Sequence, residues 1–134
     1  MDICEGLYSY LSNINDIKDK IGNRLYPEVI PENAKLPAIM YSPVLANYDS
    51  ALGGDTGFVK QTIQIVCHDK TFKKARELSR LVKNALQDFH GNMGGVNIEA
   101  VFIKTDYELS GFHTTKLDLE NYMSSIEFDF YYNE

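Results

Sequence analysis

The chain has 134 residues, of which 44% are hydrophobic and 24% are charged, and its formal net charge is −6. This length and composition predict a single globular domain over residues 1–134. The acidic balance argues against specific nucleic-acid binding, because nucleic-acid binders carry a basic surface. No apolar run approaches the roughly 20 residues that span a bilayer, and the first residues lack the features of a signal peptide. We therefore expect no membrane association.

The first predicted element is a helix over residues 2–21. Its apolar residues recur at steps of three and four, which places them on one helical face. Asp2 is a candidate N-cap, and Gly22 is suited to the C-terminal end because glycine tolerates a left-handed backbone. Residues 23–37 contain three prolines and no sustained period, which predicts an extended connection.

Two strands and a connection follow. The first strand is expected over residues 38–45, at a sheet edge or interrupted at Pro43, because proline cannot donate to a ladder of hydrogen bonds. Residues 46–56 are rich in small and turn-forming residues and predict a loop. Residues 57–68 alternate and predict a strand with one covered face. The residues on that face are Val59, Ile63, Ile65 and Cys67.

A second helix is expected over residues 71–89, with exposed charges that suit contacts with neighbouring molecules. A glycine loop at 91–95, a strand over 96–107, a polar loop over 109–119 and a strand over 120–132 complete the chain. The fold class we expect is α+β, with a mainly antiparallel four-stranded sheet and helices packed on one face. Its order is α-β-β-α-β-β.

The sequence points to no catalytic residue, metal site or cofactor, so we expect no enzyme. Cys67 and His68 would point to opposite faces of a strand and could not readily share a metal. Cys4 lies near a helix start, which could lower its pKa, but one cysteine on an amphipathic helix is usually a packing residue. No serine occupies the G-x-S-x-G pattern of a nucleophile elbow.

The two long predicted loops, 46–56 and 109–119, mix apolar and charged residues. Connections near a dozen residues are usually functional or mobile, and this mixture suits a surface that becomes ordered against a partner. The alternative is that both are hairpin tips without a role. The residues we select as candidate interface contacts are Tyr48, Asp49, Leu52, Asp55, Leu109, Phe112, His113 and Lys116.

The chain resembles the tail-completion, or tail-terminator, proteins of phages with long non-contractile tails, and most of all the tail-to-head joining proteins of Bacillus siphophages. The resemblance lies in an ordered set: Arg24, Tyr26 and Pro27, then Leu36 and Pro37, then the strand and helix over 57–89. It implies a structural protein of the virion tail at the head–tail interface, assembled in the host cytoplasm. It also implies self-association into a ring, expected to be a hexamer, with the tail tube protein and a head-completion or connector protein as partners.

Two other functions remain open. A neck or head-completion protein would bind the portal side, and pull-down against tail tubes and tailless heads would separate it from a tail protein. A small-ligand-binding regulatory domain would instead have an apolar cavity on the sheet face opposite the helices.

Overall fold

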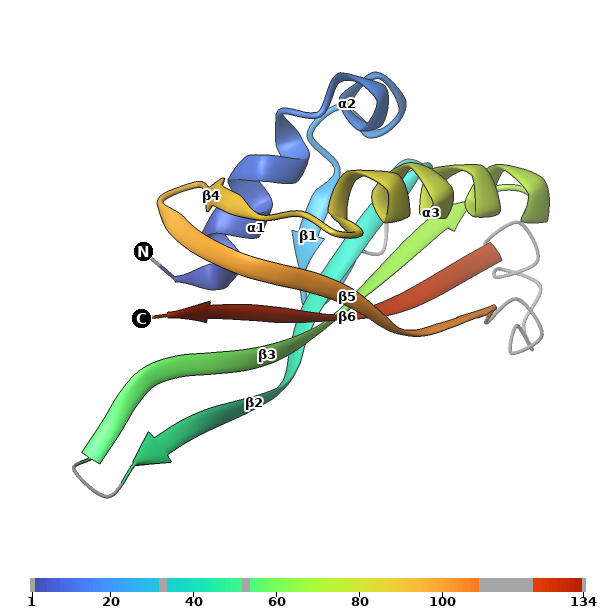
Figure 1. The fold of residues 1–134 in the computed structure, drawn as a ribbon. Helices are drawn as coiled ribbons and strands as arrows, with labels where there is room; N and C mark the ends of the chain where they lie inside the picture. The colour runs from blue at the N-terminus through green and yellow to red at the C-terminus, as the bar shows by residue number, and fades with distance from the viewer. Residues whose placement is uncertain (1, 32–33, 52–53, 109–121, 134) are drawn as a thin grey trace.

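The computed structural model of the protein describes residues 2–31, 34–51, 54–108 and 122–133 (Figure 1). Within these ranges, six strands form one mixed sheet in the order β1-β2-β3-β6-β5-β4, which curves into a half-barrel. β1 runs parallel to β2, and the other neighbouring pairs are antiparallel. The strands are β1 (Leu25–Pro27), β2 (Ala38–Ala51), β3 (Gly54–Asp69), β4 (Gly91–Met93), β5 (Val96–Glu108) and β6 (Tyr122–Asn133).

The predicted four-stranded sheet with the order α-β-β-α-β-β is wrong. The order in the described chain is α1-α2-β1-β2-β3-α3-β4-β5-β6. The two missed strands, β1 and β4, are each three residues long, which is too short for a two-residue alternation to be recognised. β1 contains Pro27, and β4 begins at Gly91 in a glycine-rich segment, so both are strands because of the neighbour they pair with.

The single helix expected over 2–21 is two helices, α1 (Ile3–Ser12) and α2 (Asn15–Ile21). Polar side chains at the break bond to the carbonyl groups of the preceding turn. The Ser12 hydroxyl donates to the Tyr8 carbonyl, and the Asn13 amide donates to the Ser9 carbonyl at 2.7 Å. Such bonds compete with helix continuation, which apolar periodicity does not register. Gly22 ends α2 with a positive φ of 61°, as predicted.

The third helix, α3 (Phe72–Leu86), starts where the sequence predicts and ends three residues earlier. Thr71 is its N-cap, and its hydroxyl accepts from the Lys74 backbone N–H at 3.2 Å. After the helix, the backbone N–H of Asp88 donates to the carbonyl of Val101 in β5 at 3.1 Å. The chain is thereby tied to the outer edge of β5, and the helix stops. No helix in the described part of the chain is long and apolar enough to cross a bilayer.

One buried cluster joins the three helices to the sheet. The four apolar residues predicted for the covered face of β3 are all buried, and so are Phe128 and Phe130 on β6. Leu7 and Leu11 from α1, and Leu78 and Leu86 from α3, are fully buried in the same cluster. The core therefore lies between the helices and the middle strands, β3 and β6.

Residues 46–56 do not form the predicted loop. β2 continues to Ala51 and β3 begins at Gly54, so the two strands make one long hairpin whose tip residues, 52 and 53, lie outside the described chain. Cross-strand pairing runs from Ala38 opposite His68 to Ala51 opposite Gly54, with register shifts after Pro43 and after Tyr48. Bulges of this kind allow two strands to stay paired through a segment whose composition is typical of turns. The other predicted loop, 109–119, lies outside the described residues.

Candidate functional site

The β2–β3 hairpin extends beyond the strands that flank it. β1 pairs with β2 only over Ile39 to Tyr41, so the described part of β2 from Ser42 onward has no neighbour on its outer side. On the other side, β6 pairs with β3 only from Phe58 onward. The end of the hairpin therefore pairs only with itself within the described chain, and Figure 1 shows it projecting away from the helices. An edge of this kind can accept another protein.

Pro43 marks the point where the edge of β2 becomes open. The Ile39 N–H donates to the carbonyl of Arg24, and the Tyr41 carbonyl accepts from the Glu28 N–H, so the odd-numbered residues here face β1. Pro43 is the next residue on that side and has no N–H to donate. The register shift follows immediately. β1, and not β2, is the edge strand of the sheet, and the interruption expected at Pro43 takes the form of a register shift within one continuous strand.

Three apolar side chains are exposed on this open stretch. The exposed fractions are 56% for Val44, 50% for Leu45 and 60% for Tyr48. Edge strands usually carry charges or lysines that block pairing with other chains. Pro43 and the bulges give this edge some protection, but it also exposes the three apolar side chains. The stretch fits an interface that forms only with a specific partner.

Of the predicted interface residues, Tyr48 is the one whose side chain is described, and it is exposed on the hairpin. Asp49 and Asp55 lie on β2 and β3 near its end, with side chains outside the description. Leu52, Leu109, Phe112, His113 and Lys116 lie outside the described residues. The interface set therefore stays a prediction. The structure adds Val44 and Leu45, which the sequence could have indicated as adjacent apolar residues just after an edge-strand proline.

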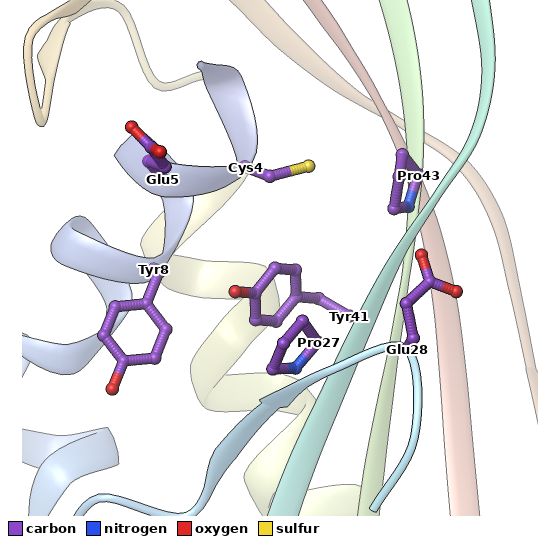
Figure 2. Close-up of a pocket in the computed structure, with 7 residues that line it drawn as sticks. All are labelled: Cys4, Glu5, Tyr8, Pro27, Glu28, Tyr41 and Pro43. Atoms are coloured by element: carbon purple, nitrogen blue, oxygen red, sulfur yellow. The ribbon is translucent and has the colours of Figure 1, made fainter. Parts of the chain in front are cut away.

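A cavity of about 370 Å³ lies beside the open edge, between α1 and the β1–β2 pair (Figure 2). Tyr8 and Tyr41 approach within 6.4 Å between ring centroids, and two prolines complete an apolar lining. Two carboxylates, Glu5 and Glu28, belong to the same lining. The seven lining residues are Cys4, Glu5, Tyr8, Pro27, Glu28, Tyr41 and Pro43.

Glu28 is held in an unusual conformation at this cavity. Its φ is 68°, in the left-handed region that non-glycine residues rarely adopt. Its backbone N–H donates to the Tyr41 carbonyl at 2.9 Å, and its carboxylate accepts from the Ser42 hydroxyl at 3.1 Å. Backbone strain of this kind persists where the surrounding structure fixes it, and it is common at functional sites.

The electrostatics of the cavity make Cys4 unreactive. Burial, together with the negative charges of Asp2 and Glu28, raises the pKa of the Cys4 thiol to about 11. Burial also raises the pKa of the Tyr41 phenol. The thiolate is the nucleophilic form of cysteine, so Cys4 is protonated and inert at neutral pH. The helix start does not lower this pKa, because the side chain is desolvated and faces carboxylates.

The described residues contain no group of three or more His, Cys, Asp or Glu side chains that could hold a metal ion. Cys67 is buried in the core while its neighbour His68 is on the other face of β3, as the alternation predicts. The cavity also differs in place from the one expected for a ligand-binding domain. It lies beside α1 and not on the sheet face opposite the helices.

Arg24 links two parts of the segment on which the family resemblance is based. Its guanidinium Nε donates to the Pro37 carbonyl at 2.8 Å, and its Nη2 donates to the Lys20 carbonyl at 3.1 Å. These bonds tie the end of α2 to the start of β2 and hold β1 beside it. The structure therefore gives Arg24 a structural role in joining these segments.

A family model described as "Tail completion protein gp17" matches residues 5–117. The chain belongs to this family. The expected membership, drawn from Arg24 to Pro37 and the segment 57–89, is confirmed. As a tail completion protein, the chain is a structural component of the bacteriophage virion, located in the tail. No curated protein compared with it matches.

A solved structure supports the fold of this tail completion protein. A chain from the "Virion of native gene transfer agent (GTA) particle" matches 96% of this chain and 92% of its own, with a TM-score of 0.69 and 13% identity. At this identity, the likeness concerns the fold alone. A second solved chain, also 13% identical, covers 97% of this chain and 96% of its own with a TM-score of 0.44, too low to carry an argument.

Proposed function

We propose that the protein assembles as a ring on the end of the tail tube, stops elongation of the tube and joins the tail to the head connector. The observation that carries this proposal is the open β2–β3 hairpin with exposed Val44, Leu45 and Tyr48 in a member of the tail completion family. The tail tube protein contacts the hairpin in this account. The family's structural role also supports a protein without enzymatic activity.

The proposed ring requires contacts between neighbouring copies of the chain that use surfaces other than the hairpin docked on the tube. Contacts between unlike surfaces of identical chains produce closed rings or open filaments. A closed ring of six, the number that the family resemblance implies, ends a tube without propagating.

The hairpin is tested by complementing a phage that lacks this gene with variant chains. Val44→Ser, Leu45→Ser and Tyr48→Ser together are expected to reduce joined virions by at least about tenfold, since exposed apolar anchors carry most of an interface's binding energy. Electron microscopy and infectious titre provide the measurement. The matched control is Phe102→Ser, because Phe102 is a 49% exposed apolar residue on β5.

The pattern of defects separates the two candidate docking sides. Loss of tail-length control or of tube binding, with head binding retained, supports contact between the hairpin and the tube. Retained tube binding with lost binding to tailless heads favours the neck or head-completion alternative. Normal titre with all three serines, in a chain that still folds, contradicts the proposed role of the hairpin.

A further inference from the structure

The exposed face of α3 is strongly basic although the chain is acidic. Six of the 13 basic residues lie between Lys70 and Lys83, where Glu77 is the one acidic residue, so the rest of the sequence carries 18 of the 19 acidic residues. The first turn of α3 has no acidic residue, and it carries Lys73 and Lys74 at the positive end of the helix dipole. This arrangement does not favour helix stability, so it calls for another explanation.

The basic residues of α3 form a continuous stripe. Lys73, Arg76, Arg80 and Lys83 follow one another at steps of three and four, which places them along one face of a helix, and all four are exposed. Arg76 lies over the ring of Phe72 at 5.7 Å, and that ring is itself exposed. The buried stripe of the same helix faces the core. The basic stripe therefore faces away from the chain's own sheet.

The cavity beside α1 has the complementary chemistry. Its tyrosine and proline lining suits the hydrocarbon stem of a lysine or arginine, and its two carboxylates suit the charged end of such a side chain. Asp2 adds negative charge close to Cys4, and no residue of α1 is basic. Figure 2 shows Glu5 on α1 and Glu28 beside β2, with the apolar residues between them. No α3 residue lines this cavity.

We propose that the α1–β2 cavity binds the basic stripe of α3 from a second copy of this chain, so that a lysine or arginine of one copy inserts between Glu5 and Glu28 of the next. The inference rests on the proposed ring and identifies the contact that builds it. Charge complementarity selects a second copy as the partner, because the basic stripe of one copy matches the acidic cavity of another. Because cavity and stripe are different surfaces, each copy offers both, and the contact repeats around a ring.

Reciprocal charge reversal tests this contact. The cavity variant carries Glu5→Lys and Glu28→Lys, and the helix variant carries Lys73→Glu, Arg80→Glu and Lys83→Glu. Each variant alone is expected to lower the yield of joined virions at least about tenfold, because like charges face each other across the contact. When the two are produced together, the unlike chains alternate around an even-numbered ring and the yield recovers. A chain with all five substitutions also recovers.

The control variant carries Asp19→Lys and Glu99→Lys, which change the net charge as the cavity variant does but lie outside both surfaces. It is expected to assemble normally. Circular dichroism and urea unfolding confirm that each variant is folded. Recovery in the mixture and in the five-substitution chain supports the contact, since misfolding cannot be rescued in this way, and the control variant measures the effect of the same change in net charge as in the cavity variant.

The outcomes that overturn the inference differ from those that overturn the ring. If both folded variants assemble normally alone, or if they fail and neither combination recovers, the contact is wrong while the ring can still stand. If only the helix variant fails and it has lost binding to double-stranded DNA, the stripe serves DNA instead. If phage without the gene make normal joined virions, the proposed function itself fails.

Discussion

Replacing Phe128 by alanine is expected to lower the free energy of unfolding by about 4 kcal/mol, the range typical of a buried phenylalanine. Phe128 has no exposed surface and lies on β6, the strand between β3 and β5. It is opposite Ile63 and Ile103 in the two neighbouring strands, and its ring is 6.3 Å from that of Phe130. The alanine substitution would therefore remove side-chain contacts with both neighbouring strands, β3 and β5.

Urea unfolding measures this effect, with Phe102→Ala as the matched control. Phe102 is half exposed on β5 and touches the ring of Tyr131, so its loss is expected to cost no more than about 1 kcal/mol. If Phe128→Ala leaves too little folded protein to measure, Phe128→Leu provides a smaller cavity at the same place. Equal effects for positions 102 and 128 contradict the placement of the core.

Replacing Gly6 by alanine is expected to destabilise the protein by about 2–3 kcal/mol through overpacking. A Cβ at Gly6 would lie 2.4 Å from the backbone carbonyl oxygen of Met93 in β4. The Met93 backbone cannot rotate away as a side chain could, so α1 would have to shift relative to β4. In an exposed helix the same substitution stabilises by about 1 kcal/mol, because alanine has the higher helix propensity. The sign of the change therefore reports whether α1 contacts β4 this closely.

Ser9→Ala is the control, because Ser9 is exposed one turn along α1 and keeps its Cβ. Its effect is expected to stay within about 0.5 kcal/mol. Gly94 makes the reciprocal contact: a Cβ there would lie 2.8 Å from the Cα of Gly6, and its φ of 56° also favours glycine. Increased stability on Gly6→Ala contradicts the close packing of α1 against the β4–β5 turn.

The sequence predicts the long elements of this fold because their patterns are local. The buried faces of β3 and α3 follow from apolar periodicity, and the start of α3 follows from its threonine cap. The two short strands could not be predicted from local patterns. β1, for example, is held by the hydrogen bond from Arg24 to Pro37, which is thirteen residues away. The break in the first helix depends on side-chain bonds from Ser12 and Asn13 that periodicity does not detect.

The candidate site divides in the same way. Pro43 indicates where β2 loses its outer neighbour, because a missing backbone donor is a local property of the sequence. The composition of residues 46–56 predicts a loop, yet residues 46–51 and 54–56 belong to β2 and β3, since register shifts accommodate small and turn-forming residues. The cavity combines α1, the segment after β1 and the start of β2, and sequence alone gives no sign that these segments meet. The basic stripe is visible in the sequence, but its partner surface is not.

In the proposed assembly, the open hairpin contacts the tube, and the α3 stripe and the α1–β2 cavity join neighbouring copies. The buried core holds the elements that carry these three surfaces together. We expect Pro43 and the bulges to limit pairing of this open stretch with other strands, so that it pairs with one specific partner.

A cryo-electron microscopy reconstruction of the head–tail junction in the intact virion tests the central claim most directly. The account predicts a single closed ring of this protein where the tube ends, with the β2–β3 hairpin directed at the tube and the connector on the opposite side. Copies distributed along the tube, a location at the distal tip, or a ring whose hairpins point away from the tube would contradict it.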